Sequence, residues 1–232
     1  MSQKWLQLQT HFRRASGLTG RKFFLLFLFL LGSLVLYPFA QESGSSYIAL
    51  RVLGIVVILL SVYAVSFRRS LVTFALLLAI PAVLQRFQPT RADASLFSIF
   101  NTVFSFAFDL FIVVVIFRRV FTWDQPNSET IFGALCIYLL VGFSFASMYR
   151  MVATVQPNAF YLDPRINLHT APERFDFIYY SFGTITSLGA AGVTAVSGQA
   201  RSLTVIEAII GVLYLAVLIA RLMGAYRAAP PS

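Results

Sequence analysis

A run of small and hydroxyl-bearing residues near the C-terminus has the composition needed to coordinate a cation through its backbone. The run consists of Thr186, Ser187, Leu188, Gly189, Ala190, Ala191 and Gly192. Successive backbone carbonyls can replace the hydration shell of an ion when some residues of a turn adopt left-handed dihedrals, which glycine does most readily. A turn of small residues that only lets two buried helices approach each other is the alternative explanation of the same run.

The segments on either side of this run indicate which elements would position it. Asp176–Leu188 is apolar and aromatic in its first half, yet too short to cross a bilayer, so it predicts a re-entrant helix that is buried in protein or lines water. Leu203–Met223 is apolar almost without interruption and long enough to cross. A short helix, a turn and a crossing helix in this order form the layout that a pore helix, an ion filter and an inner helix require.

These residues resemble the pore domain of the potassium-channel superfamily. The resemblance rests on Thr184 to Gly189 with its flanks, and on Ala134–Leu140 and Arg201–Arg221, which are similar to the outer and inner helices of small bacterial six-crossing potassium-channel-like proteins. It implies a homotetramer, because four filter turns must surround one axis. It also implies a permeant monovalent cation, K⁺ or Na⁺.

The outer half of the filter departs from the family's pattern. Ala190 stands where the family has tyrosine, Ala191 where it has a second glycine, and Gly192 where it has an acidic residue. A methyl group at 191 opposes positive φ by roughly 1–2 kcal/mol. Carbonyls of Ser187 to Gly189 could still form inner ion sites. We therefore expect a broad cation conductance, an altered selectivity or no conductance, rather than tight K⁺ selection. The alternative function is a non-conducting, channel-like scaffold or partner subunit in the membrane.

The crossing helix after the filter contains further candidate site residues. Gly211 lies where the family places its gating hinge, although close helix packing would equally explain a glycine there. Glu207 is an ionisable group within an apolar segment, and we expect it to hydrogen-bond the pore helix behind the filter. The positions predicted to face an apolar cavity are Val212, Leu215 and Ile219.

Composition assigns the chain to a membrane. Of its 232 residues 58% are hydrophobic and 12% charged, with a mean hydropathy of +0.78. This is too little polar surface for a soluble globule. We expect an all-α protein with six crossing helices and a re-entrant pore helix between the fifth and sixth. The six spans are Phe23–Phe39, Tyr47–Ser66, Leu71–Gln85, Ala94–Phe117, Ile131–Tyr149 and Ser202–Met223.

A net charge of +9 could indicate nucleic acid in a soluble protein, but here the basic residues cluster between apolar runs. With six crossings they fall on one side, which the positive-inside rule assigns to the cytoplasm. We therefore expect a multi-pass protein of a bacterial-type plasma membrane, in contact with lipid and not nucleic acid, with both termini cytoplasmic. The residues concerned are Lys4, Arg13, Arg14, Arg21, Lys22, Arg68, Arg69, Arg118, Arg119 and Arg227.

Two linked units are predicted: a four-helix sheath over residues 1–122 and a pore domain over 123–232. From Leu96 to Phe117 the fourth span has no basic residue, so it lacks the repeated charges of a voltage sensor. It contains Asp109 instead, near one helical face with Asn101. Asp109 should pair with Arg118, Arg119 or Arg68, or stay neutral, and either a structural bond or a pH-responsive role would explain it.

Enzymatic chemistry is not expected. The one cysteine, Cys136, lies in an apolar run, and the two histidines, His11 and His169, lie in polar segments. No catalytic residue, metal site or cofactor is therefore predicted. A transporter would more typically show interrupted helices in two inverted halves. The tail from Ala225 is too short for a soluble regulatory domain.

Overall fold

The computed structural model describes residues 22–37, 44–67, 69–85, 87, 96–122, 128–167, 169 and 171–227. The basic N-terminal residues up to Arg21, Arg68 and the expected boundary between sheath and pore domain lie outside these ranges. Within them the chain forms seven helices and two short strands. They are α2 (Lys22–Leu36), α3 (Gly44–Ala64), α4 (Arg69–Gln85), α5 (Leu96–Phe121), α6 (Ser128–Val155), β1 (Phe160–Leu162), α7 (Arg174–Ile185), β2 (Val193–Ala195) and α8 (Gly198–Arg227).

The predicted all-α class is confirmed, and each predicted span coincides with a helix. Three helices are long and apolar enough to cross a membrane: Ile99–Phe121, Ser128–Val155 and Gly198–Gly224. Three further apolar helices are shorter, at Lys22–Leu36, Leu50–Ala64 and Arg69–Leu84. By length and composition the structure thus supports three spans, and the predicted number of six stays a prediction.

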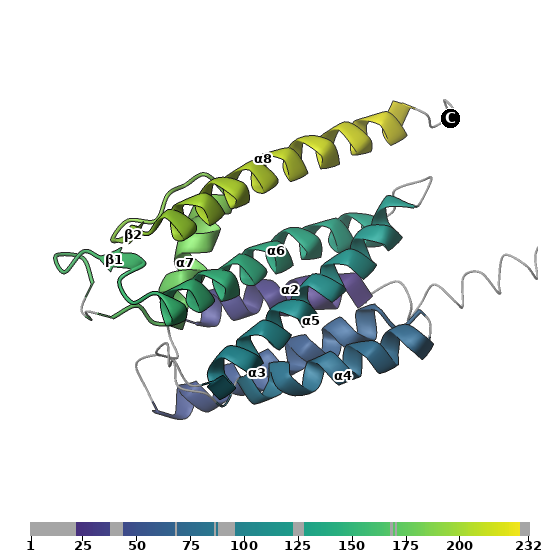
Figure 1. The fold of residues 1–232 in the computed structure, drawn as a ribbon. Helices are drawn as coiled ribbons and strands as arrows, with labels where there is room; N and C mark the ends of the chain where they lie inside the picture. Colours follow the sequence, from purple (N-terminus) through teal and green to yellow (C-terminus); the bar gives the residue numbers. More distant parts are fainter. Residues whose placement is uncertain are drawn as a thin grey trace, which may run out of the picture.

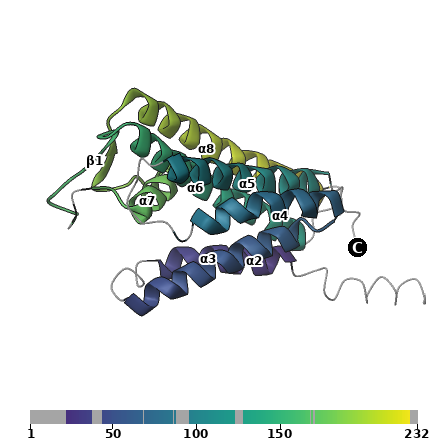
Figure 2. The same cartoon turned by 60° about the horizontal axis from the view of Figure 1, so that its bottom comes forward.

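Helix α6 lies at the centre of the bundle. Helices α2 and α5 pack on one side of it, with α3 and α4 behind them, while α7 and α8 lie on the other side (Figure 1). The view in Figure 2 places α2 and α3 side by side on the face opposite α8. The largest core forms among α2, α3, α4, α5 and α6 and includes Leu26, Ile112 and Ile137. This packing attaches α2 and α5 to α6.

The first turn of α2 is bound directly to α6. The Phe23 backbone N–H donates to a carboxylate oxygen of Glu129 at 3.3 Å, and the Cys136 thiol lies 3.3 Å from the Phe23 carbonyl oxygen. Because the first N–H groups of a helix have no partner within the helix, a carboxylate from a neighbouring helix satisfies one of them. These two contacts fix the end of α2 against the start of α6.

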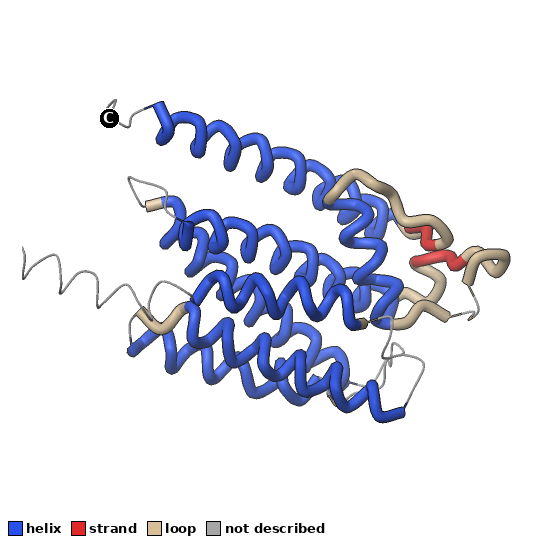
Figure 3. The backbone as a smooth tube through the Cα atoms, turned by 180° about the vertical axis from the view of Figure 1, so that it is seen from behind, coloured by secondary structure: helices blue, strands red, loops and turns tan. Residues whose placement is uncertain are grey.

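The two ends of the bundle differ in chemistry. At one end, Lys22 donates to Ser66 at 3.0 Å, Arg119 lies over the ring of Phe67, and Arg221 lies over the ring of Phe121. At the other end, β1 and β2 form an antiparallel pair in which Tyr161 faces Thr194 (Figure 3). Neither strand could be predicted from sequence, because strands of three residues are too short to show a period of two.

Candidate functional site

Helix α7 is capped at the end remote from the loop. Glu173 and Asp176 form a reciprocal capping box, with the Glu173 N–H donating to Asp176 Oδ2 at 2.6 Å. His169 Nε2 lies 2.8 Å from the same carboxylate oxygen. Acidic residues in a first turn complement the positive end of the helix dipole. The negative, carbonyl-bearing end of α7 therefore points to the loop that follows.

That loop, residues 186–192, is the predicted filter, and its backbone is bent as a carbonyl-lined turn requires. Ser187, Gly189 and Gly192 have φ values of 60°, 85° and 84°. Ala191 does not adopt positive φ, so the strain expected there is absent and Gly192 takes the left-handed conformation instead. The side chain of Leu188 is 83% exposed in the single chain. Positive φ at Ser187 costs roughly 1–2 kcal/mol for a residue with a Cβ.

Hydrogen bonds hold this loop through its N–H groups. Ser187 N–H donates to Thr184 O at 3.0 Å, and Gly189 N–H donates to Gly183 O at 2.9 Å. Among the hydrogen bonds of the described residues, none reaches the carbonyl oxygens of residues 186–189. Four consecutive carbonyl oxygens thus stay available to an ion or to water.

Two glycines allow the loop and α8 to approach α7. A Cβ on Gly183 would lie 2.5 Å from the Gly189 carbonyl oxygen, and a Cβ on Gly211 would lie 2.5 Å from the Ile185 carbonyl oxygen. Real Cβ atoms do not come so close to backbone atoms. Gly211 therefore has a packing role against the end of α7, inside an α8 that runs unbroken from Gly198 to Arg227. The sequence analysis did not single out Gly183, because its neighbour lies in a different element.

Glu207 of α8 lies against α7 and is fully buried. The Tyr149 hydroxyl of α6 lies 2.5 Å from Glu207 Oε2, and the Ser181 hydroxyl of α7 lies 2.5 Å from Oε1. Ser181 also lies 2.7 Å from the Gly142 carbonyl oxygen. One carboxyl group thus joins α6, α7 and α8. Glu207 could be recognised from sequence because its charge interrupts an apolar run. Its partners Tyr149 and Ser181 could not, because the chain contains many other hydroxyl residues of the same kinds.

The outer end of the loop is tied to the segment after β1. The Gly192 carbonyl oxygen accepts from Asp163 N–H at 2.9 Å and from Asn167 Nδ2 at 2.8 Å. Asp163 also pairs with Arg165 at 2.7 Å, and this guanidinium lowers the pKa of the Asp163 carboxyl. A Cβ on Gly192 would lie 2.8 Å from Asn167 Nδ2. Position 192 therefore requires glycine both for its φ and for this contact.

The remaining predicted site residues divide between two regions. Val212, Leu215 and Ile219 all lie on exposed parts of α8 in the single chain. Asp109 lies away from the filter loop and lines a pocket together with Arg51, a residue that the sequence analysis had not suggested as its neighbour. Arg118 and Arg119, suggested as its partners, belong to the last turn of the same helix.

One comparison bears on the C-terminal part of the chain. Residues 131–228 match the model of a family described as Ion channel (Ion_trans_2). This segment is similar to a potassium-channel-like pore domain. The match begins in the first turns of α6 and extends through α7, the loop and α8, so the matched segment includes every element that positions the loop. In the comparisons, no curated protein and no solved structure matches the chain.

Proposed function

We propose that the protein is a tetrameric cation channel in which residues 186–192 of each chain form the ion filter. The observation that carries this proposal is the set of four carbonyl oxygens at residues 186–189, which accept no hydrogen bond among the described residues. Carbonyl oxygens are the ligands with which such filters replace an ion's hydration shell. The carbonyl-bearing end of α7, equivalent to roughly −0.5 charge, favours a cation and opposes an anion.

The tetramer is supported by the exposure of α8 and of the loop. In the most apolar part of α8 only 11% of residues are buried in the single chain, against 56% in α6. Lipid would cover part of the exposed surface of α8. Lipid cannot be what covers Leu188, however, because this side chain lies beside the carbonyl oxygens and lipid there would also cover the ion site. Four chains around one axis would cover Leu188 and bring four loops together.

Selectivity and orientation are part of the same proposal. With alanine at 190 and 191, we propose permeation by K⁺ and Na⁺ without strong preference. The basic contacts of Lys22, Arg119 and Arg221 at one end of the bundle support cytoplasmic termini in a bacterial-type plasma membrane. The filter loop lies at the opposite end (Figure 1).

The test is the current through purified full-length protein in planar bilayers under a K⁺/Na⁺ gradient, with Gly189→Ala beside the natural chain. Gly189 has φ of 85° and open space around a Cβ, so this substitution changes the backbone conformation and nothing else. We expect the natural chain to conduct cations and the Gly189→Ala variant to lose most of its current. Gly198→Ala is the matched control, because Gly198 also has open space but no positive φ.

The natural chain's reversal potential separates the possible results. A reversal near zero with clear current supports a weakly selective pore, and a reversal that follows K⁺ would mean that the alanine-containing filter still selects. Silence of the natural chain, with current restored by Ala190→Tyr and Ala191→Gly together, would favour a non-conducting scaffold. Gly192 should not be replaced in that variant, because its φ and its contact with Asn167 require glycine.

A further inference from the structure

A pocket between the sheath and the pore domain concentrates positive charge. It is lined by residues of α2, α3, α5, α6 and α7 and has a volume of about 120 Å³. A single water needs roughly 10–15 Å³ of such space, so the pocket is large enough for a polyatomic group. It lies apart from the filter loop, since no residue of 186–192 lines it.

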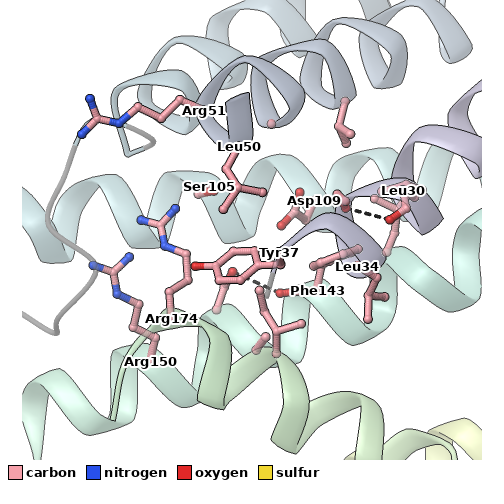
Figure 4. Close-up of a pocket in the computed structure, with 17 residues that line it drawn as sticks. Leu30, Leu34, Tyr37, Leu50, Arg51, Ser105, Asp109, Phe143, Arg150 and Arg174 are labelled. Carbon is pink, nitrogen blue, oxygen red and sulfur yellow. Dashed lines mark hydrogen bonds between the residues drawn. The ribbon is translucent and has the colours of Figure 1, made fainter. Parts of the chain in front are cut away.

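Three arginines from three different helices converge on this pocket. Arg51 comes from α3, Arg150 from α6 and Arg174 from α7, whereas Asp109 of α5 is the one acidic residue among those lining it. The formal charge of the lining is therefore +2 (3 − 1). Figure 4 shows the three guanidinium groups toward one end of the pocket, with Tyr37 between them and Asp109.

A buried arginine is unusual in a bundle of apolar helices. Arg150 is 4% exposed, and Arg51 lies within an apolar helix. Buried charges are costly unless they are paired or bind a ligand. Three guanidinium groups that line one pocket favour an anion there over a cation.

The walls of the pocket indicate the kind of anion. Guanidinium groups bind phosphate oxygens in pairs of parallel hydrogen bonds, which is why arginine predominates at phosphate sites. Away from the arginines, the apolar side chains of Leu30, Leu34 and Phe143 line the pocket around Asp109 (Figure 4). We propose that this pocket binds a phosphate group through Arg51, Arg150 and Arg174. The apolar walls fit best when that phosphate is the headgroup of an anionic lipid whose chains follow the helices.

The test uses the delipidated full-length protein in detergent and measures the shift of its thermal unfolding midpoint on ligand addition. The ligands are phosphatidylglycerol, phosphatidylcholine with the same acyl chains, and inorganic phosphate. We expect phosphatidylglycerol to stabilise the protein at roughly tenfold lower concentration than phosphatidylcholine. Arg51→Gln and Arg174→Gln should each remove most of that difference, because each eliminates charge-assisted hydrogen bonds.

Arg165→Gln is the matched control, because it removes the same charge from a side chain that is 87% exposed outside the pocket. If only inorganic phosphate shifted the unfolding midpoint, and the shift depended on the arginines, the pocket would still be a phosphate site, but its ligand would be the free ion rather than a lipid. Equal binding of the two lipids by the natural chain, without a response to phosphate, would overturn the proposal even if the variants failed to fold. A loss with Arg165→Gln as large as with the pocket variants would also overturn it.

Discussion

At the scale of single residues, the contacts of the Ser181 hydroxyl predict that Glu207 carries a proton. This hydroxyl has one hydrogen, yet it lies 2.7 Å from the Gly142 carbonyl oxygen and 2.5 Å from Glu207 Oε1. Both contacts are hydrogen bonds only when Glu207 carries a proton and donates to Ser181. The titratable group that is hydrogen-bonded to Glu207 in the described part of the chain is Tyr149 of α6, which supplies a hydroxyl rather than a cation.

We therefore expect Glu207→Gln to preserve the network, because an amide can donate to Ser181 and accept from Tyr149. Its unfolding free energy should lie within about 1 kcal/mol of the natural chain's, whereas Glu207→Ala should cost roughly 1–3 kcal/mol by leaving buried hydroxyls unpaired. Thermal unfolding in detergent would measure both. If the glutamine variant were as unstable as the alanine variant, Glu207 would be an ionised acceptor rather than a neutral acid.

At the scale of elements, α8 and α7 are joined through glycine. We expect Gly211→Ala to destabilise the protein by roughly 1–3 kcal/mol, since a Cβ there would lie 2.5 Å from the Ile185 carbonyl oxygen. Gly224→Ala in the same helix is the control, because nothing lies within 4 Å of its Cβ and alanine favours helix. Unfolding midpoints of the two variants check this. If the two variants were equally stable, Gly211 would not be needed for packing, and the gating-hinge role that its position suggested would be favoured instead.

The helices could be predicted from sequence because each apolar run is continuous and ends at basic or turn-forming residues. The β1–β2 pair could not, since Phe160 and Ala195 are distant in the chain and each strand has only three residues. The close approaches at Gly183 and Gly211 could not be predicted either, because each joins residues of different elements. A glycine in sequence does not reveal whether its hydrogen permits a contact, a bend or neither.

At the scale of the whole molecule, the sequence indicated the pore domain through a contiguous pattern, whereas the arginine pocket depends on residues from separate helices. Arg51, Arg150 and Arg174 lie far apart in the chain, so their convergence follows only from how α3, α6 and α7 pack. The same holds for Asp109, for which the sequence suggested Arg118, Arg119 or Arg68 as partners, or a neutral state, and which lines the same pocket as Arg51. Contacts between distant segments are set by tertiary packing rather than by periodicity.

The proposed assembly predicts which apolar residues of α8 face water. In a tetramer, Val212, Leu215 and Ile219 would line a cavity and Leu77 of α4 would face lipid, although all four side chains are exposed in the single chain. We expect cysteines at the three α8 positions to react with a charged methanethiosulfonate reagent at least about tenfold faster than Leu77→Cys, because a thiolate forms in water and not in hydrocarbon.

The natural chain provides the background for this measurement, since its single cysteine, Cys136, is fully buried. Leu77 is a matched control because its side chain is 65% exposed, so slow reaction there reflects lipid rather than packing. Faster modification at 212, 215 and 219 would show an aqueous cavity along α8, even for a chain that carries no current. Rates equal to that of Leu77→Cys would place this face of α8 in lipid, and the chain would then not assemble around a water-filled axis.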